Sequence, residues 1–234
     1  MFHFKNFSID DSTAAMKTGT DAVLLGAWTP SGNETRILDI GSGTGILALM
    51  MAQRNPKTEI DAVEINLAAA NLAKKNVSIS PWPERIYIFN DSVQEFALKA
   101  NHVYSLIISN PPFFTDSLKA PDKARNLARH NDNLPVKDLL RITSKMLTEQ
   151  GRAAFIIPAD AFVNWTAIAS GFALFPAFVT KVKSSPVHNP HRVMVIFTKE
   201  HKTHIPENEL IIYSSKNIYS NEYRELTKKF YLNF

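Results

Sequence analysis

The chain has 234 residues, of which 45% are hydrophobic and 21% are charged, and its 26 Lys and Arg against 22 Asp and Glu give a net charge of +4. This composition is typical of a globular protein, and it excludes collagen-like and intrinsically disordered chains. The absence of cysteine excludes a disulfide framework, a thiolate metal site and a cysteine nucleophile. From the length we expect a single domain over residues 1–234.

The N-terminal residues 1–11 alternate apolar and polar side chains, and they lack the basic and then apolar order of a signal peptide. No segment reaches the roughly 18 consecutive apolar residues of a membrane helix, because the most hydrophobic stretch, 169–179, is interrupted by Gly171 and Pro176. We therefore expect a cytoplasmic protein with no membrane partner. A pI near 9.2 fits a nucleic-acid partner, but it also fits many enzymes without one.

From residue 36 onward, short apolar runs alternate with helix-like segments. The runs are apolar on both faces, as in a parallel sheet covered by helices on both sides. The pattern predicts strands at 36–40, 59–64, 85–89 and 103–108, and helices at 46–54, 67–76 and 92–98.

After a polar loop at 115–133, the pattern continues with helices and strands that complete the sheet. We expect two of these strands to pair as an antiparallel hairpin, and the C-terminal extension 205–234 to pack against the sheet edge with a strand and a helix. The predicted fold is α/β, Rossmann-like, with a mostly parallel seven-stranded sheet, helices on both faces and an antiparallel terminal hairpin. The further predictions are helices at 136–147, 161–169 and 221–231 and strands at 153–157, 177–183, 192–198 and 210–213.

A glycine-rich turn with Gly41, Gly43 and Gly45 lies where the first of these strands passes into a helix. Glycines let backbone N–H groups approach a ligand closely, and the following helix N-terminus adds a favourable dipole. Glu64 ends the next strand, where a carboxylate can accept both hydroxyls of a ribose. A dinucleotide fingerprint needs glycine or alanine where this chain has Ile46, so NAD is disfavoured.

The alternative ligand is S-adenosylmethionine, which carries ribose and adenine but no pyrophosphate. Asp39, just before the glycines, then steadies the turn or the cationic methionine end of the cofactor; otherwise it is a solvated charge at a strand end. Asp91 follows the third strand and can accept from the adenine amino group; otherwise it caps the next helix.

The tetrapeptide Asn110-Pro111-Pro112-Phe113 ends the fourth strand and should face the same crevice as the glycine turn. The two prolines fix φ and remove two N–H donors, so the turn offers acceptors. The Asn110 side-chain oxygen and the Pro111 carbonyl can orient both N–H bonds of a planar amine and aim its lone pair at a methyl group. Phe113 can stack on the substrate. The alternative is a simple turn followed by a buried aromatic residue.

These motifs resemble those of class I S-adenosylmethionine-dependent methyltransferases that act on planar amino groups, and in particular the bacterial tRNA1(Val) (adenine(37)-N6)-methyltransferases. The resemblance covers most of the chain. It is carried by residues 15–28 (AMKTGTDAVLLGAW), 110–114 (NPPFF) and 222–232 (EYRELTKKFYL). It implies that an N-terminal lead-in, residues 1–30, covers the cofactor site.

The resemblance also implies a role for individual residues. Glu64 binds the ribose, Asp91 binds the cofactor's adenine, and Asn110 to Phe113 bind the target adenine. The sequence Asn90-Asp91-Ser92 departs from the commoner Gly-Asp or Ala-Asp, which leaves the adenine contact open. The residues implied at the methionine end of the cofactor are Lys17, Thr18, Gly19 and Asp21.

Basic residues follow the substrate motif and could bind RNA phosphates, in which case affinity should fall steeply with salt. Acidic residues dilute the run, so a solvated charged loop is the alternative. The histidines show no metal-ligand spacing, and we expect no metal. A flipped purine would stack on Phe113, whereas we expect Phe114 to be a core residue. The candidate RNA-binding residues are Lys119, Lys123, Arg125, Arg129 and Arg192.

The sequence therefore predicts a methyltransferase that modifies adenine N6 in tRNA, and three rivals remain. Proteins that methylate guanine N2 of ribosomal RNA usually carry His where this chain has Phe114, and glutamine N5-methyltransferases of proteins usually end the motif in Tyr. A nucleotide-binding module without activity is disfavoured by the intact Asn110 to Phe113. No obligate protein partner is evident from the sequence.

Overall fold

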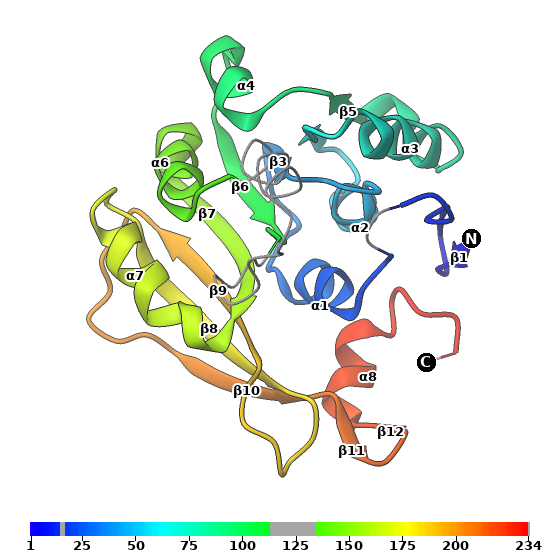
Figure 1. Cartoon of the computed structure of the whole chain (residues 1–234), viewed down its shortest axis with the longest axis vertical. Coiled ribbons are helices and arrows are strands. Elements are labelled where there is room, and N and C mark those ends of the chain that lie inside the picture. Colours follow the sequence, from blue (N-terminus) through cyan, green and yellow to red (C-terminus); the bar gives the residue numbers. More distant parts are fainter. Residues whose placement is uncertain (15–16, 113–133, 234) are drawn as a thin grey trace, which may run out of the picture.

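The computed structural model describes residues 1–14, 17–112 and 134–233, in which strands and helices alternate (Figure 1). Within these residues, eight strands form one central sheet, and β1–β2 and β11–β12 form two small sheets. The elements of the first half are β1 (Phe2–His3), β2 (Ser8–Ile9), α1 (Thr20–Trp28), β3 (Arg36–Ile40), α2 (Ile46–Arg54), β4 (Glu59–Val63), α3 (Leu67–Ser78), η1 (Pro83–Arg85), β5 (Ile86–Phe89), α4 (Val93–Lys99) and β6 (Tyr104–Ser109). Those of the second half are α6 (Val136–Met146), β7 (Leu147–Pro158), η2 (Ala159–Ala161), α7 (Phe162–Ser170), β8 (Phe175–Lys183), β9 (Arg192–Thr198), β10 (Glu207–Ile211), β11 (Tyr213–Ser215), β12 (Ile218–Tyr219) and α8 (Asn221–Thr227).

The strand order of the central sheet is β10-β8-β9-β7-β6-β3-β4-β5. The run β7-β6-β3-β4-β5 is parallel throughout, whereas β9 is antiparallel to both of its neighbours, β7 and β8. The Rossmann-like α/β class and the antiparallel hairpin of β8 and β9 are thereby confirmed.

The predicted number of seven strands is wrong, because β10 adds an eighth at the edge, parallel to β8. The apolar pattern did not reveal the start of this strand, since Glu207 and Glu209 alternate there with other polar residues. Both glutamates pair with lysines of β8: Lys181 Nζ lies 2.7 Å from Glu207 Oε2, and Lys183 Nζ lies 2.7 Å from Glu209 Oε2. Cross-strand charge pairs thus replace apolar contacts on this exposed edge.

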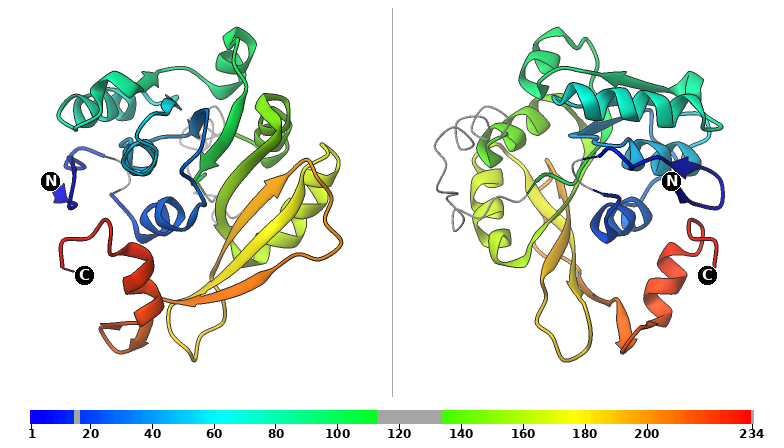
Figure 2. Two further views of the ribbon diagram at one scale, coloured as in Figure 1. Left: turned by 180° about the vertical axis from the view of Figure 1, so that it is seen from behind. Right: turned by 45° about the vertical axis from the view of Figure 1, so that its right-hand side comes forward.

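Helices cover both faces of the sheet, as the sequence predicts (Figure 2). Successive strand residues point to opposite faces, so Leu106 and Ile108 of β6 pack in one core with α1, α2 and Tyr223 of α8. Ile107 packs on the other face with α4, α6 and α7. Burial on both faces explains why the strands are apolar at nearly every position.

Helix α1 was not predicted, and its burial gives the reason. Residues 22–27 are all buried. A helix that is enclosed on every side needs no polar face, so it lacks the 3.6-residue periodicity from which surface helices are recognised.

The two chain ends lie side by side (Figure 1). Phe4 forms an isolated antiparallel bridge with Tyr231, and Lys5 N donates to Phe230 O at 2.8 Å. Helix α8 ends at Thr227 and not at 231 as predicted, yet Phe230 is still buried. Among the described residues, no helix has both the length and the apolar character needed to cross a bilayer.

Candidate active site

Four adjacent parallel strands, β6, β3, β4 and β5, end at one edge of the sheet and bring the predicted motifs together. Asp39 of β3 is opposite Ile108 of β6, so the next residues along the two strands lead to Gly41 and Asn110. Ser109 Oγ fixes this junction by donating to Ile40 O at 2.7 Å. The glycine turn and the Asn-Pro-Pro segment therefore leave the sheet side by side.

The glycine turn owes its shape to backbone conformations that other residues rarely adopt. Gly41, Gly43 and Gly45 have φ of 72°, 53° and 82°. The turn is attached to β4, because the N–H groups of Gly41 and Ser42 both donate to Val63 O, at 2.9 and 3.1 Å. A Cβ added at Gly41 or Gly43 would meet nothing within 4 Å, so this side of the turn is open to a ligand.

Glu64 lies directly after β4 and connects two strand ends. Its Oε2 accepts from Gly43 N at 2.9 Å and its Oε1 accepts from Asn66 N at 2.9 Å. Asn90, which follows β5, donates from Nδ2 to the carbonyl oxygens of Glu64 and Ile65 at 2.9 and 3.0 Å. These bonds of Asn90 to the segment after β4 were not predicted, although its position right after a predicted strand was the available signal.

Asp39 is fully buried, so it is not the solvated charge offered as the alternative. Its Oδ2 accepts from Ala48 N of α2 at 3.1 Å, whereas Oδ1 has no hydrogen-bond partner. Burial, and secondarily the negative charge of Glu64, raise the pKa of Asp39 to about 7. The hydroxyl of Ser42, in the turn, is also buried without a partner. Two polar groups beside the open glycine turn therefore retain hydrogen-bonding capacity.

Asp91 lies at the end of β5, half-buried. It does not cap α4, because Ser92 does so by accepting from Glu95 N at 3.1 Å. Asp91 Oδ1 accepts from Ser92 N at 2.9 Å, and Oδ2 pairs with Lys99 Nζ at 2.7 Å. The alternative of a helix cap is thus wrong, and the carboxylate is held at the strand end by Lys99.

The Asn-Pro-Pro segment is described as far as Pro112. Asn110 and Pro111 are partly exposed and Pro112 is exposed, directly beyond the end of β6. Phe113 and Phe114 lie outside the described residues, as do four of the candidate RNA-binding residues, Lys119, Lys123, Arg125 and Arg129.

The lead-in residues Lys17, Thr18 and Gly19 precede α1, for which Gly19 is the N-terminal cap residue. Lys17 Nζ donates to the carbonyl oxygens of Asp11 and Ser12, at 2.6 and 2.9 Å. Thr18 N donates to Asp11 Oδ2 at 3.0 Å, and this bond holds the pKa of Asp11 below its usual value. The Lys17 side chain and the Thr18 backbone are therefore engaged in shaping the lead-in itself, whereas the buried Thr18 hydroxyl has no hydrogen-bond partner among the described residues.

Asp21, in the first turn of α1, accepts from Arg192 Nε of β9 at 2.8 Å. This contact joins the lead-in to the sheet. Arg192 thus lies beside one of the predicted cofactor residues, and its role as an RNA contact stays a prediction. In the described part of the chain, no cluster of three or more His, Asp or Glu side chains could hold a metal ion; the expectation that the protein needs no metal stays a prediction.

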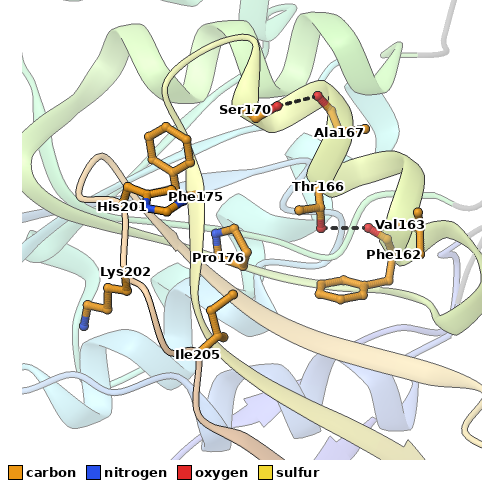
Figure 3. Close-up of a pocket in the computed structure, with 10 residues that line it drawn as sticks. All are labelled: Phe162, Val163, Thr166, Ala167, Ser170, Phe175, Pro176, His201, Lys202 and Ile205. Atoms are coloured by element: carbon orange, nitrogen blue, oxygen red, sulfur yellow. Dashed lines mark hydrogen bonds between the residues drawn. The ribbon is translucent and has the colours of Figure 1, made fainter.

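A hollow of about 520 Å³ lies between α7, β8 and residues 201–205, separated from β6 by β9 and β7 (Figure 3). Its lining is apolar apart from a few groups. Thr166 and Ser170 in its wall donate to carbonyl oxygens of their own helix, those of Phe162 and Ala167. The hollow offers little to a charged nucleoside, so the sheet edge described above is the better candidate site.

Comparison with known proteins agrees with this geometry. Residues 12–154 match the model of the methyltransferase small domain. Two relatives named tRNA1(Val) (adenine(37)-N6)-methyltransferase, from Bacteroides fragilis and Flavobacterium johnsoniae, are 45% and 42% identical over 99% of this chain, and the matches cover 97% and 99% of those proteins.

Solved structures show the same fold. A predicted O-methyltransferase from Agrobacterium tumefaciens aligns with a TM-score of 0.68 at 19% identity, over 90% of this chain and 96% of that one. A ribosomal protein L11 methylase from Lactobacillus delbrueckii aligns with a TM-score of 0.59 at 15% identity, over 82% and 84%. The fold, the glycine turn and the full-length likeness lead to one conclusion: the chain belongs to the methyltransferase small domain family, together with the tRNA1(Val) (adenine(37)-N6)-methyltransferases.

Proposed function

We propose that this protein transfers a methyl group from S-adenosylmethionine to the N6 amino group of an adenine in tRNA, at position 37 of tRNA1(Val). The observation that carries the proposal is the junction of β3 and β6, where Ser109 Oγ bonds Ile40 O and places the glycine turn beside Asn110. The substrate follows from the names of relatives that match the whole chain.

The residues at the sheet edge fit the cofactor. S-Adenosylmethionine supplies an electrophilic methyl group on a sulfonium centre. Open space above Gly41 and Gly43 admits its methionine and ribose, and the unpartnered oxygens of Asp39 and Ser42 are available to a polar ligand. Glu64 has lone pairs left for the ribose hydroxyls, since each of its oxygens accepts one backbone N–H.

Three further groups complete the proposed cofactor site. Asp91, fixed by Lys99, can accept from the adenine amino group. The lead-in residues Lys17 to Gly19, together with Asp21, border the methionine end from the start of α1.

Asn110 and the two prolines orient the target amine. An aromatic amine is a weak nucleophile because its lone pair is delocalised into the ring. The Asn110 side-chain oxygen and the Pro111 carbonyl accept its two N–H bonds, which directs the lone pair at the methyl carbon, and Pro112 adds no competing donor. Phe113 stacks on the flipped purine. Proximity and orientation then supply most of the rate acceleration.

We propose that tRNA phosphates are bound by the basic residues that follow this motif. Support comes from the sequence order, because Lys119, Lys123, Arg125 and Arg129 follow Phe113 within 16 residues. A tRNA substrate places the enzyme in the cytoplasm.

The N-terminal lead-in and the C-terminal extension belong to a single domain over residues 1–234. Support for this comes from β10, which is a strand of the central sheet, and from the pairing of Phe4 with Tyr231.

The test is incubation with labelled S-adenosylmethionine and separate pools of tRNA, ribosomal RNA and protein, followed by nucleoside and peptide mass spectrometry. N6-methyladenosine in tRNA is expected. Methylated guanine in ribosomal RNA or methylated glutamine in protein would replace the proposal by one of its rivals.

The role of Asn110 is tested by Asn110→Ala, with Asn208→Ala as the control because Asn208 is an exposed amide on the edge strand β10. Asn110→Ala should lower kcat on the order of 10²-fold or more, since the amine is no longer oriented. Binding of S-adenosylhomocysteine should remain measurable in both variants. Normal turnover in Asn110→Ala would refute the assigned role.

A further inference from the structure

Helix α3 contacts the glycine turn along one of its faces. A Cβ added at Gly45 would lie only 3.4 Å from Ala73 Cβ, so the turn and the helix touch. Asn76 follows Ala73 by one helical turn on the same face and is fully buried. A buried amide in the middle of a helix is costly unless its polar atoms are paired.

All the hydrogen-bonding groups of the Asn76 side chain are used, and their partners come from two distant segments. Oδ1 accepts from Asp10 N at 2.8 Å, and Nδ2 donates to Asp10 O at 3.0 Å. Nδ2 also donates to Thr44 O, inside the glycine turn, at 2.9 Å. We call these three bonds the Asn76 clip. One side chain thereby joins the lead-in to the glycine turn.

Beyond Asp10, Ser12 bonds back to Asp10, and Lys17 and Thr18 bond back to Asp11. The Asp10 carboxylate accepts from Lys75 Nζ at 2.8 Å and from Ser12 N and Oγ at 3.1 and 2.6 Å, and these bonds hold the pKa of Asp10 below its usual value. Beyond Ser12, the bonds from Lys17 and Thr18 back to Asp11 fix the approach to α1. Displacement of Asp10 would therefore disturb the residues before α1 as well.

We propose that Asn76 is a positioning residue that makes the two sides of the cofactor site, the lead-in and the glycine turn, form as one unit. The inference rests on the proposed function, because it assumes that the lead-in borders the cofactor. Without the clip, a smaller fraction of molecules holds the lead-in in its binding conformation, and the apparent affinity falls by that fraction.

The decisive variants are Asn76→Ala and Asn76→Asp. Aspartate keeps the acceptor for Asp10 N, but it replaces two donors by an oxygen that faces the carbonyls of Asp10 and Thr44. The matched control is Asn55→Ala, because Asn55 is equally buried and its Nδ2 also donates to a backbone carbonyl, that of Met51, at the opposite end of α2. Asp10→Pro removes the N–H that donates to Asn76 Oδ1, and it leaves the buried side chains of the core unchanged.

Two measurements are made on the full chain: the Kd of S-adenosylhomocysteine by calorimetry, and the rate of tryptic cleavage after Lys17. We expect both Asn76 variants to raise the Kd roughly tenfold or more and to speed the cleavage several-fold. Asp10→Pro should raise the Kd about threefold or more, because one hydrogen bond of the clip is lost. Asn55→Ala should lower the melting temperature but leave the Kd within about twofold of wild type.

An unchanged Kd in Asn76→Ala, or an equal rise in Asn55→Ala, would overturn the proposal. If the Asn76 variants do not fold, an unchanged Kd and cleavage rate in Asp10→Pro, which lacks one bond of the clip, would overturn it as well. Failure of the proposed function looks different: wild-type protein would not bind S-adenosylhomocysteine, while faster cleavage in the variants would still report the clip.

Discussion

Asp39→Asn should raise the stability of the protein relative to wild type between pH 5 and pH 8, and it should weaken cofactor binding. Asp39 is fully buried with one partnered oxygen, and its pKa rises from 3.8 to about 7, mainly because burial penalises the charged form. The unfolded chain ionises near the lower value, whereas the native protein stays protonated until about pH 7. Wild-type stability therefore falls as pH rises between these two values, and the fall is complete above the higher one.

The size of the effect follows from the two pKa values. Each unit of difference is worth about 1.4 kcal/mol, so ionisation of Asp39 costs the native state about 4 to 5 kcal/mol in full. About 3 kcal/mol of this cost appears between pH 5 and pH 8. The asparagine has no proton to lose, and any penalty from its extra N–H groups is the same at both pH values. The stability of the variant relative to wild type should therefore rise by about 3 kcal/mol over this interval.

The assay is urea unfolding of both proteins at pH 5 and pH 8, with Asp138→Asn as the control, because Asp138 is a partly exposed carboxylate on α6. The control should show no pH-dependent gap. Calorimetry with S-adenosylhomocysteine at pH 8 should show weaker binding by Asp39→Asn, because the carboxylate no longer meets the ammonium of the ligand. An equal stability difference at pH 5 and pH 8 would refute the reasoning.

Two substitutions distinguish effects on cofactor binding from effects on stability. Gly43→Ala should cost only about 1–2 kcal/mol of stability, the price of a side chain at φ 53°, but it should weaken S-adenosylhomocysteine binding more strongly because the new Cβ points into open space; calorimetry showing wild-type affinity would contradict this. Tyr104→Phe should cost about 2 kcal/mol in urea unfolding, because the buried hydroxyl donates to Asp61 Oδ2 at 2.7 Å and that carboxylate is paired with Arg36. Its kcat and KM should remain at wild-type values. A change in either would show that the Tyr104–Asp61 hydrogen bond also affects catalysis.

The parallel half of the sheet could be predicted because its strands are buried on both faces. Their apolar runs stand out from the helices between them, and the observed bounds of β3, α2 and β9 are those predicted. β7 begins at Leu147, earlier than predicted. Its start was missed because residues 148–150 are polar and precede the buried part of the strand. Hydrophobic patterns thus locate most of the strands and the helices with one apolar face. They miss the start of β10, which charge pairs stabilise, and α1, which is buried on every side.

The strand-end residues of the candidate site were predictable for a topological reason. Parallel neighbours align their carboxyl ends, so Glu64 and Asn110 had to meet the glycine turn once the strands were assigned. Asn76 was not predictable in this way. Its partners lie 66 and 32 residues away along the chain, and a single asparagine within a helix resembles a solvated residue until the tertiary contacts are known.

The positive charges near the β8–β9 hairpin show why charge alone does not identify an RNA-binding surface. Lys181 and Lys183 are paired with glutamates of β10, and Arg192 bonds Asp21. A pair of opposite charges attracts a distant phosphate far less than an isolated cation does, and a cation must also lose its carboxylate before it can bind one. A phosphate that binds beside the hairpin therefore has to displace these carboxylates first, so the basic run after Phe113 stays the main prediction for RNA contacts.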